Sequence, residues 1–156
     1  MSTRSTYRVR EKFFDNKEQK EYTRDLVLMY IQCDGYPSGH PSETAEWLSR
    51  ANLVNGIGAG KDKTGKTFMA NGTGCLAAQL VAKYKDGVGS CYLHAIKQRG
   101  NCGEDYTYDI VVDYKDQNEP QSLTYIAYEC GWKKRPKKIW EGKPVDFPAF
   151  VEKWGQ

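Results

Sequence analysis

The residues best suited to chemistry lie in one stretch, residues 32–41, which reads Gln-Cys-Asp-Gly-Tyr-Pro-Ser-Gly-His-Pro. An imidazole beside a carboxylate can transfer protons, so His40 and Asp34 form a candidate acid–base pair. Cys33 adds a thiol that His40 would have to activate for nucleophilic catalysis. The spacing supports no known catalytic set, whereas two glycines and two prolines favour a loop of fixed shape. We therefore interpret the stretch as one wall of a binding site. A small hydrolase that uses Cys33, Asp34 and His40 is an alternative.

Two predicted elements position this loop. The apolar run 26–31 before it is typical of a central strand, and the preceding segment 5–14 alternates as a strand that pairs with it in an antiparallel hairpin. Residues 42–51 after it form a predicted helix, with Ser42 as its cap and Ala45, Leu48 and Ala51 on one face. A loop at a strand-to-helix junction commonly carries functional groups.

A second candidate site is the turn at residues 71–74, Asn-Gly-Thr-Gly, which opens an amphipathic helix predicted over residues 75–85. Free N–H groups and the positive end of such a helix favour a phosphate or carboxylate. We expect this turn to join the loop and an N-terminal arginine in one anion-binding site. Arginine supplies charge, a tyrosine supplies a stacking face, and glycines allow close approach. The expected ligand-binding residues are Arg4, Gln32, Asp34, Gly35, Tyr36, Gly39, His40, Asn71, Gly72 and Gly74.

Two basic segments are weaker candidates. Residues 60–67 match the phosphate-binding pattern G-x-x-x-x-G-K-[ST], but they lack the preceding buried strand and the following helix that this pattern requires, so a basic turn is predicted. A run of cations flanked by Trp132 and Trp140 is typical either of a nucleic-acid-binding segment or of a solvated strand edge. Its members are Lys133, Lys134, Arg135, Lys137 and Lys138.

Length and composition indicate a globular protein of one domain. The chain has 156 residues, 39% of them hydrophobic and 13% aromatic, with a net charge of +3. Five widely spaced cysteines without a Cys-x-x-Cys pair predict reduced thiols, so no metal site is expected, and no cofactor either. No apolar run reaches the length of a membrane span and no secretion signal is visible, so a cytoplasmic protein is expected.

The element order β-β-α-α-β-β-β-(β)-α predicts an α+β fold. Strands 90–97, 105–114 and 122–130 are expected to form a meander, and hairpin-linked strands pair antiparallel. The predicted architecture is a two-layer sandwich of an antiparallel sheet with two central helices packed on one face, followed by a short C-terminal helix capped by Asp146. Residues 131–156, the basic tail and terminal helix, are interpreted as an appendage of the single domain.

Three segments carry a family resemblance: the start Met-Ser-Thr-Arg-Ser, the element Gln32-x-Asp34-Gly35-Tyr36-Pro37-x-Gly39, and residues 71–79. Over residues 1–130 the chain resembles small proteins encoded by bacteriophages and prophages. The resemblance implies an accessory protein that counters host defence, either by sequestering a signalling nucleotide or by binding a host protein. We therefore expect a non-enzymatic protein of the host-cell cytoplasm that holds a small anionic, nucleotide-like ligand. The alternative is a protein–protein inhibitor of a host defence factor, and a homo-oligomer is left open.

Overall fold

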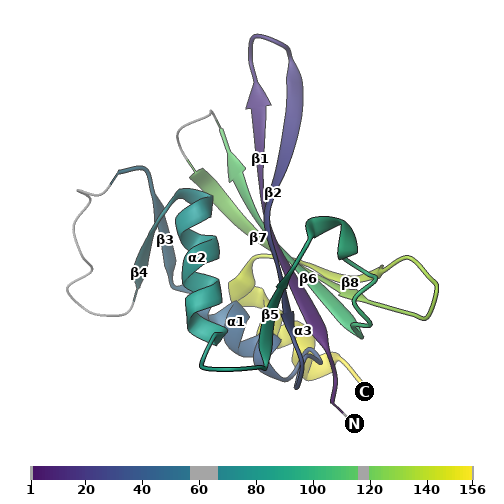
Figure 1. The fold of residues 1–156 in the computed structure, drawn as a ribbon. Helices are drawn as coiled ribbons and strands as arrows, with labels where there is room; N and C mark the ends of the chain where they lie inside the picture. The colour runs from purple at the N-terminus through teal and green to yellow at the C-terminus, as the bar shows by residue number, and fades with distance from the viewer. Residues whose placement is uncertain (1, 57–66, 116–119, 156) are drawn as a thin grey trace.

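The computed structural model describes residues 2–56, 67–115 and 120–155, and its fold is drawn in Figure 1. The phosphate-loop-like residues 60–66 lie outside the described residues. The elements follow in the order β1 (Ser5–Asp15), β2 (Lys20–Ile31), α1 (His40–Ser49), β3 (Ala51–Val54), β4 (Phe68–Asn71), α2 (Gly72–Tyr84), β5 (Cys91–His94), η1 (Ile96–Gln98), β6 (Tyr106–Tyr114), β7 (Pro120–Glu129), β8 (Lys137–Gly142), η2 (Pro144–Asp146) and α3 (Phe147–Lys153).

One six-stranded sheet dominates the fold, with strand order β5-β2-β1-β6-β7-β8, and it curls into half a barrel (Figure 1). β1 and β2 form the predicted antiparallel hairpin, which is confirmed. β1 and β6, in contrast, are parallel, with Ser5 opposite Tyr106 and Phe13 opposite Tyr114. β3 and β4 form a separate parallel pair. The sheet is therefore mixed.

The predicted antiparallel two-layer sandwich with two central helices is wrong. Its error lies in the meander: β5 pairs with β2, and β6 enters the sheet beside β1. Parallel neighbours need a long crossover, and residues 32–105 between β2 and β6 supply one. Alternating residues identify strands, but they do not identify the strand edge that a later strand joins.

The core lies between the sheet and helices α1, α2 and α3, which are on the same side of it (Figure 1). Alternation along β1 places Tyr7 and Val9 in this core and turns Thr6 and Arg8 to the other face. Tyr108 stacks on Tyr7 with ring centroids 5.3 Å apart. Buried aromatic rings therefore form the centre of the molecule, where large rings bury much apolar surface each.

The two long helices begin earlier than predicted. α1 begins at His40 with Pro41 in its first turn, and no side chain caps it. The prediction that Ser42 caps this helix is therefore wrong. Its Oγ instead donates to the carbonyl oxygen of Pro37 at 2.8 Å. α2 begins at Gly72, so the turn predicted at residues 71–74 is already its first turn.

The segment after residue 131 contributes to both the sheet and the core. β8 pairs with β7, with Trp140 opposite Ala127. Phe147, at the start of α3, is fully buried, and its ring lies 5.0 Å from that of Tyr125 and 5.1 Å from that of Trp140. Burial of such a ring stabilises the fold by about 1.5–3 kcal/mol.

Candidate anion-binding groove

The loop at residues 32–41 packs against the start of β1. The N–H of Gly35 donates to the carbonyl oxygen of Thr3 at 2.9 Å, and the hydroxyl of Tyr108 donates to the carbonyl oxygen of Gly35 at 2.8 Å. A Cβ on Gly35 would lie 2.5 Å from the Cβ of Ser5, and one on Gly39 would lie 2.2 Å from the carbonyl oxygen of Asp34. These glycines therefore allow close packing within the chain itself.

His40 is held in a buried network of hydroxyl groups. Its Nδ1 lies 2.7 Å from the hydroxyl of Tyr7, and its Nε2 lies 3.3 Å from Oγ of Ser5. Thr44 and Tyr84 hydrogen-bond to each other beside it. Burial lowers the pKa of His40 to about 4, although Asp34 acts in the opposite direction, so the imidazole is neutral at neutral pH.

This network offers no accessible catalytic pair. Ser5 and His40 have the contact of a nucleophile and its base, but Ser5 is fully buried beneath Gly35. Cys33 is exposed, and within the described part of the chain its thiol has no hydrogen bond to His40. The side chains of Gln32, Asp34 and Tyr36, which belong to the loop, are exposed. The contacts of His40 with Ser5 and Tyr7 therefore hold the loop against β1.

The turn at residues 71–74 lies at the other end of β1. The hydroxyl of Tyr114 accepts from the N–H of Thr73 at 3.0 Å and lies 2.7 Å from its Oγ1. Asn71 and Gly72 line a cavity of about 530 Å³ with Phe13 and neighbouring residues. Ser5 and Phe13 are eight residues apart on one strand, about 26 Å. The structure does not bring this turn together with the loop or with Arg4.

Arg4 instead lies with the basic tail. A groove of about 770 Å³ runs between the segments 99–105 and 130–136. Its cationic side chains come from three parts of the chain that are far apart in sequence. Neither motif spacing nor composition indicates that these three parts meet. The groove is lined by Arg4, Arg99, Gly100, Asn101, Gly103, Glu104, Asp105, Cys130, Gly131, Trp132, Lys133, Lys134, Arg135 and Pro136. Lys137 and Lys138 lie outside it, on β8.

The groove presents cations beside an open aromatic ring. Trp132 is 87% exposed, and Nζ of Lys133 lies 5.9 Å from its ring centroid. Within the described residues, no ion pair involves Lys133, Lys134 or Arg135. A ligand with a flat ring and negative charge matches both features, because rings stack on tryptophan and anions bind such cations.

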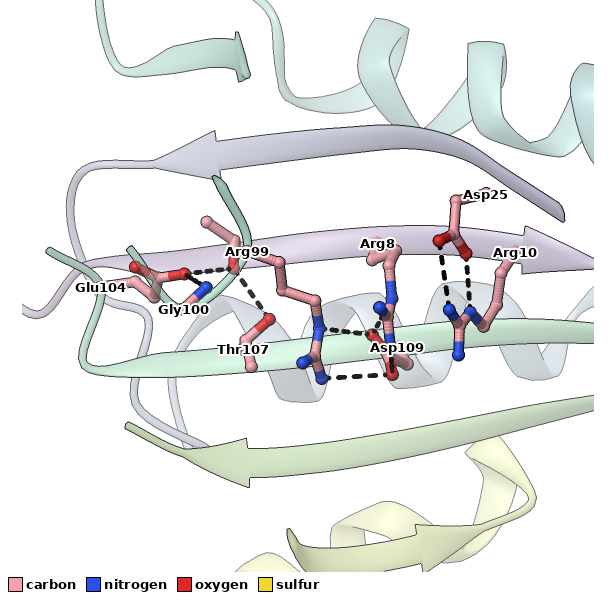
Figure 2. Close-up of polar contacts among 9 residues, drawn as sticks. Arg8, Arg10, Asp25, Arg99, Gly100, Glu104, Thr107 and Asp109 are labelled. Carbon is pink, nitrogen blue, oxygen red and sulfur yellow. Dashed lines mark hydrogen bonds and ion pairs between the residues drawn. The ribbon is translucent and has the colours of Figure 1, made fainter. Parts of the chain in front are cut away.

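The wall at residues 99–105 is fixed by a buried carboxylate. Glu104 accepts hydrogen bonds from Oγ1 of Thr6 at 3.2 Å and from the N–H of Cys102 at 2.8 Å. It also accepts from the N–H of Gly100 at 2.6 Å (Figure 2). On the other wall, the N–H of Cys130 donates to the carbonyl oxygen of Asp105 at 2.8 Å. The wall at residues 99–105 is therefore tied to β1, and the start of the other wall is tied to the first, which reduces the entropy lost when a ligand binds.

The thiols of the groove are poor nucleophiles. Burial and then the carboxylate of Glu104 raise the pKa of Cys102 to about 11. Burial is also the largest cause that raises the pKa of Cys130 to about 12. Both thiols are protonated at neutral pH, whereas the thiolate is the reactive form. Neither Cys102 nor Cys130 is therefore available as a nucleophile in the groove at neutral pH.

Most groove residues are absent from the predicted sets, and among them Arg99 and Trp132 supply a cation and an aromatic ring. In the sequence, Arg99 lies in a polar segment in which Gly100 and Gly103 indicate a turn. Both adopt positive φ, +81° and +75°, which favours glycine. In the sequence, Trp132 stands only as a flank of the basic run.

No family model, curated protein or solved structure matches the chain. The assignment of a site therefore depends on the geometry of the groove. Among the residues that the structure describes, no three His, Cys, Asp or Glu side chains are grouped to hold a metal ion. None of the helices in the described ranges has the length and apolarity needed to cross a membrane.

Proposed function

We propose that the protein is a phage-encoded accessory binding protein without catalytic activity, which holds a small anionic, nucleotide-like ligand in the groove between residues 99–105 and 130–136. The observation that carries this proposal is the exposed ring of Trp132 beside cations from both walls. A phosphate would bind the cations while a base stacks on the ring. By sequestering such a molecule in the host cytoplasm, the protein would counter host defence.

Protein–protein inhibition is the second candidate function, and the edge strand β5 favours it. Among the strands that the structure describes, β5 pairs only with β2, and its residues Tyr92 and Leu93 are 47% and 60% exposed. An exposed sheet edge with apolar side chains can accept a strand from a host protein. Binding of a host protein that is lost on replacement of Leu93 and retained on replacement of Trp132 would favour this candidate over nucleotide binding.

Isothermal titration calorimetry with ADP, pyrophosphate and adenosine tests the proposed function. ADP should bind more tightly than adenosine, which lacks phosphate, and than pyrophosphate, which lacks a base. Trp132→Ala should weaken ADP binding, because one base stack contributes about 1–3 kcal/mol. The matched control is Lys17→Ala on the exposed turn between β1 and β2, which should leave ADP binding unchanged.

Mass spectrometry of material released from the denatured protein supplies an independent readout. A phosphorylated compound that co-purifies with the wild type and is missing from Trp132→Ala would support the proposal. If no compound is released and neither ADP nor pyrophosphate produces heat on titration, the proposal is contradicted.

A further inference from the structure

Two arginines share one buried aspartate on the sheet face opposite the helices (Figure 2). Arg8 donates from Nε and Nη2 to the two carboxylate oxygens of Asp109 at 3.0 and 2.6 Å. Arg99 donates from the same two nitrogens to the same oxygens, both at 3.2 Å. A carboxylate has about four acceptor positions, so the two guanidinium groups saturate it.

A neighbouring pair on the same face shows the ordinary arrangement. Arg10 donates from Nε and Nη2 to the two oxygens of Asp25 at 2.7 and 3.1 Å, and each side chain is 22% exposed (Figure 2). One guanidinium balances one carboxylate there. At Asp109 two guanidinium groups meet one carboxylate, so the unit carries one surplus positive charge.

The surplus charge is largely withdrawn from water. The side chain of Asp109 is 1% exposed, and those of Arg8 and Arg99 are 14% exposed each. A buried charge without a matching counter-ion is costly, so such a unit favours an anion that approaches it. Only Arg99 of the three lines the groove, where an anion can reach it.

Arg99 is held in one orientation. Tyr128 lies against its guanidinium at 4.6 Å from ring centroid to Cζ, and Asp109 binds its Nε and Nη2. Its Nη1 has no hydrogen bond within the described residues. Asp109 occupies the edge formed by Nε and Nη2, and Tyr128 covers one face. A guanidinium whose Nη1 is left without a partner can donate to a phosphate oxygen, and lysine would not reproduce this geometry.

We infer that Arg99 is the phosphate-binding residue of the groove. Arg8 is a positioning residue: because it also pairs with Asp109, the carboxylate does not balance the charge of Arg99. This inference rests on the proposed function and specifies its ligand as a phosphate ester or diphosphate. The phosphate supplies the second negative charge that the unit of Arg8, Asp109 and Arg99 lacks. Glu104 and Asp105 also line the groove. Asp105 is paired with Arg4, whereas Glu104, among the described residues, accepts only from Thr6 and two N–H groups and therefore adds a negative charge of its own beside the unit.

Calorimetry on the full chain with ADP, pyrophosphate and adenosine, comparing Arg8→Met with Arg10→Met, tests the inference. Both variants lower the net charge by one and remove a guanidinium from β1. Arg8→Met leaves Arg99 balanced by Asp109, so affinity for ADP and pyrophosphate should fall at least about fivefold. Affinity for adenosine should stay unchanged, and Arg10→Met should bind all three like the wild type.

Arg99→Gln provides a second variant that leaves Arg8 and Asp109 as a balanced pair, and it decides the outcome if Arg8→Met fails to fold. It should lose affinity for ADP and pyrophosphate and show a shallower dependence of log affinity on log salt concentration. If neither variant loses more affinity than Arg10→Met while the wild type binds ADP, the inference is overturned and the proposed function stands. If the wild type binds neither ADP nor pyrophosphate, the proposed function itself fails.

Discussion

The Nδ1 atom of His40 lies 2.7 Å from the hydroxyl oxygen of Tyr7, and this contact joins the loop at residues 32–41 to the centre of the sheet. Tyr7 is fully buried, and its hydroxyl also lies 3.2 Å from Oγ1 of Thr44 on α1. The network extends to Tyr84 at the end of α2. The imidazole therefore connects loop, strand and both long helices.

Acid should destabilise the protein through His40. Its pKa in the folded state, about 4, lies below the ordinary value of 6.5, so the unfolded chain binds the proton more readily between these values. Stability from the neutral imidazole is present above pH 6.5 and is lost as the pH falls toward 4. Urea unfolding should show a slope of up to about 1.4 kcal/mol per pH unit from this group. His40→Gln should remove that component; an unchanged slope would contradict the assignment.

Tyr7→Phe should lower the free energy of unfolding by about 1–3 kcal/mol, because it leaves buried polar partners at His40 and Thr44 without a hydroxyl. Tyr22→Phe is the matched control, since the hydroxyl of Tyr22 meets Glu18 at the surface. The control should change stability by less than about 0.5 kcal/mol. Equal effects in urea denaturation would refute a structural role for the network.

Gly39→Ala should destabilise the protein by about 2 kcal/mol or more, since the added Cβ would lie 2.2 Å from the backbone oxygen of Asp34. Gly74→Ala provides the opposite case. It lies in the first turn of α2 with its nearest contact at 3.8 Å, so alanine should stabilise by about 0.5–1 kcal/mol. Thermal unfolding of both variants checks the contrast in sign.

Asp109→Asn should cost about 3–5 kcal/mol of stability, because it leaves the guanidinium groups of Arg8 and Arg99 without their carboxylate. Glu141→Gln is the control: the ion pair of Glu141 with Lys138 is about half exposed on both sides, and its loss should cost at most about 1 kcal/mol. Similar denaturation midpoints for the two variants would show that the buried unit contributes little to the fold.

Local pattern was sufficient for several elements and insufficient for the sheet. Alternation predicts the hairpin of β1 and β2, and helical spacing predicts α2, because both signals come from residues close in sequence. The parallel entry of β6 beside β1 depends on contacts between residues about 100 positions apart. No local pattern encodes such a pairing.

The sequence by itself determined which side chains and turns could form a binding site. They are Arg4, a basic run beginning at Lys133, and glycine-containing loops at residues 32–41 and 71–74. Only the tertiary structure decided which of them meet. It places Arg4 with Lys133 in one groove, commits His40 to Tyr7, and separates residues 71–74 from both by the length of β1. The physical reason is strand order: pairing β6 parallel to β1 brings residues 99–105 to the start of β1, whereas α2 begins near its end.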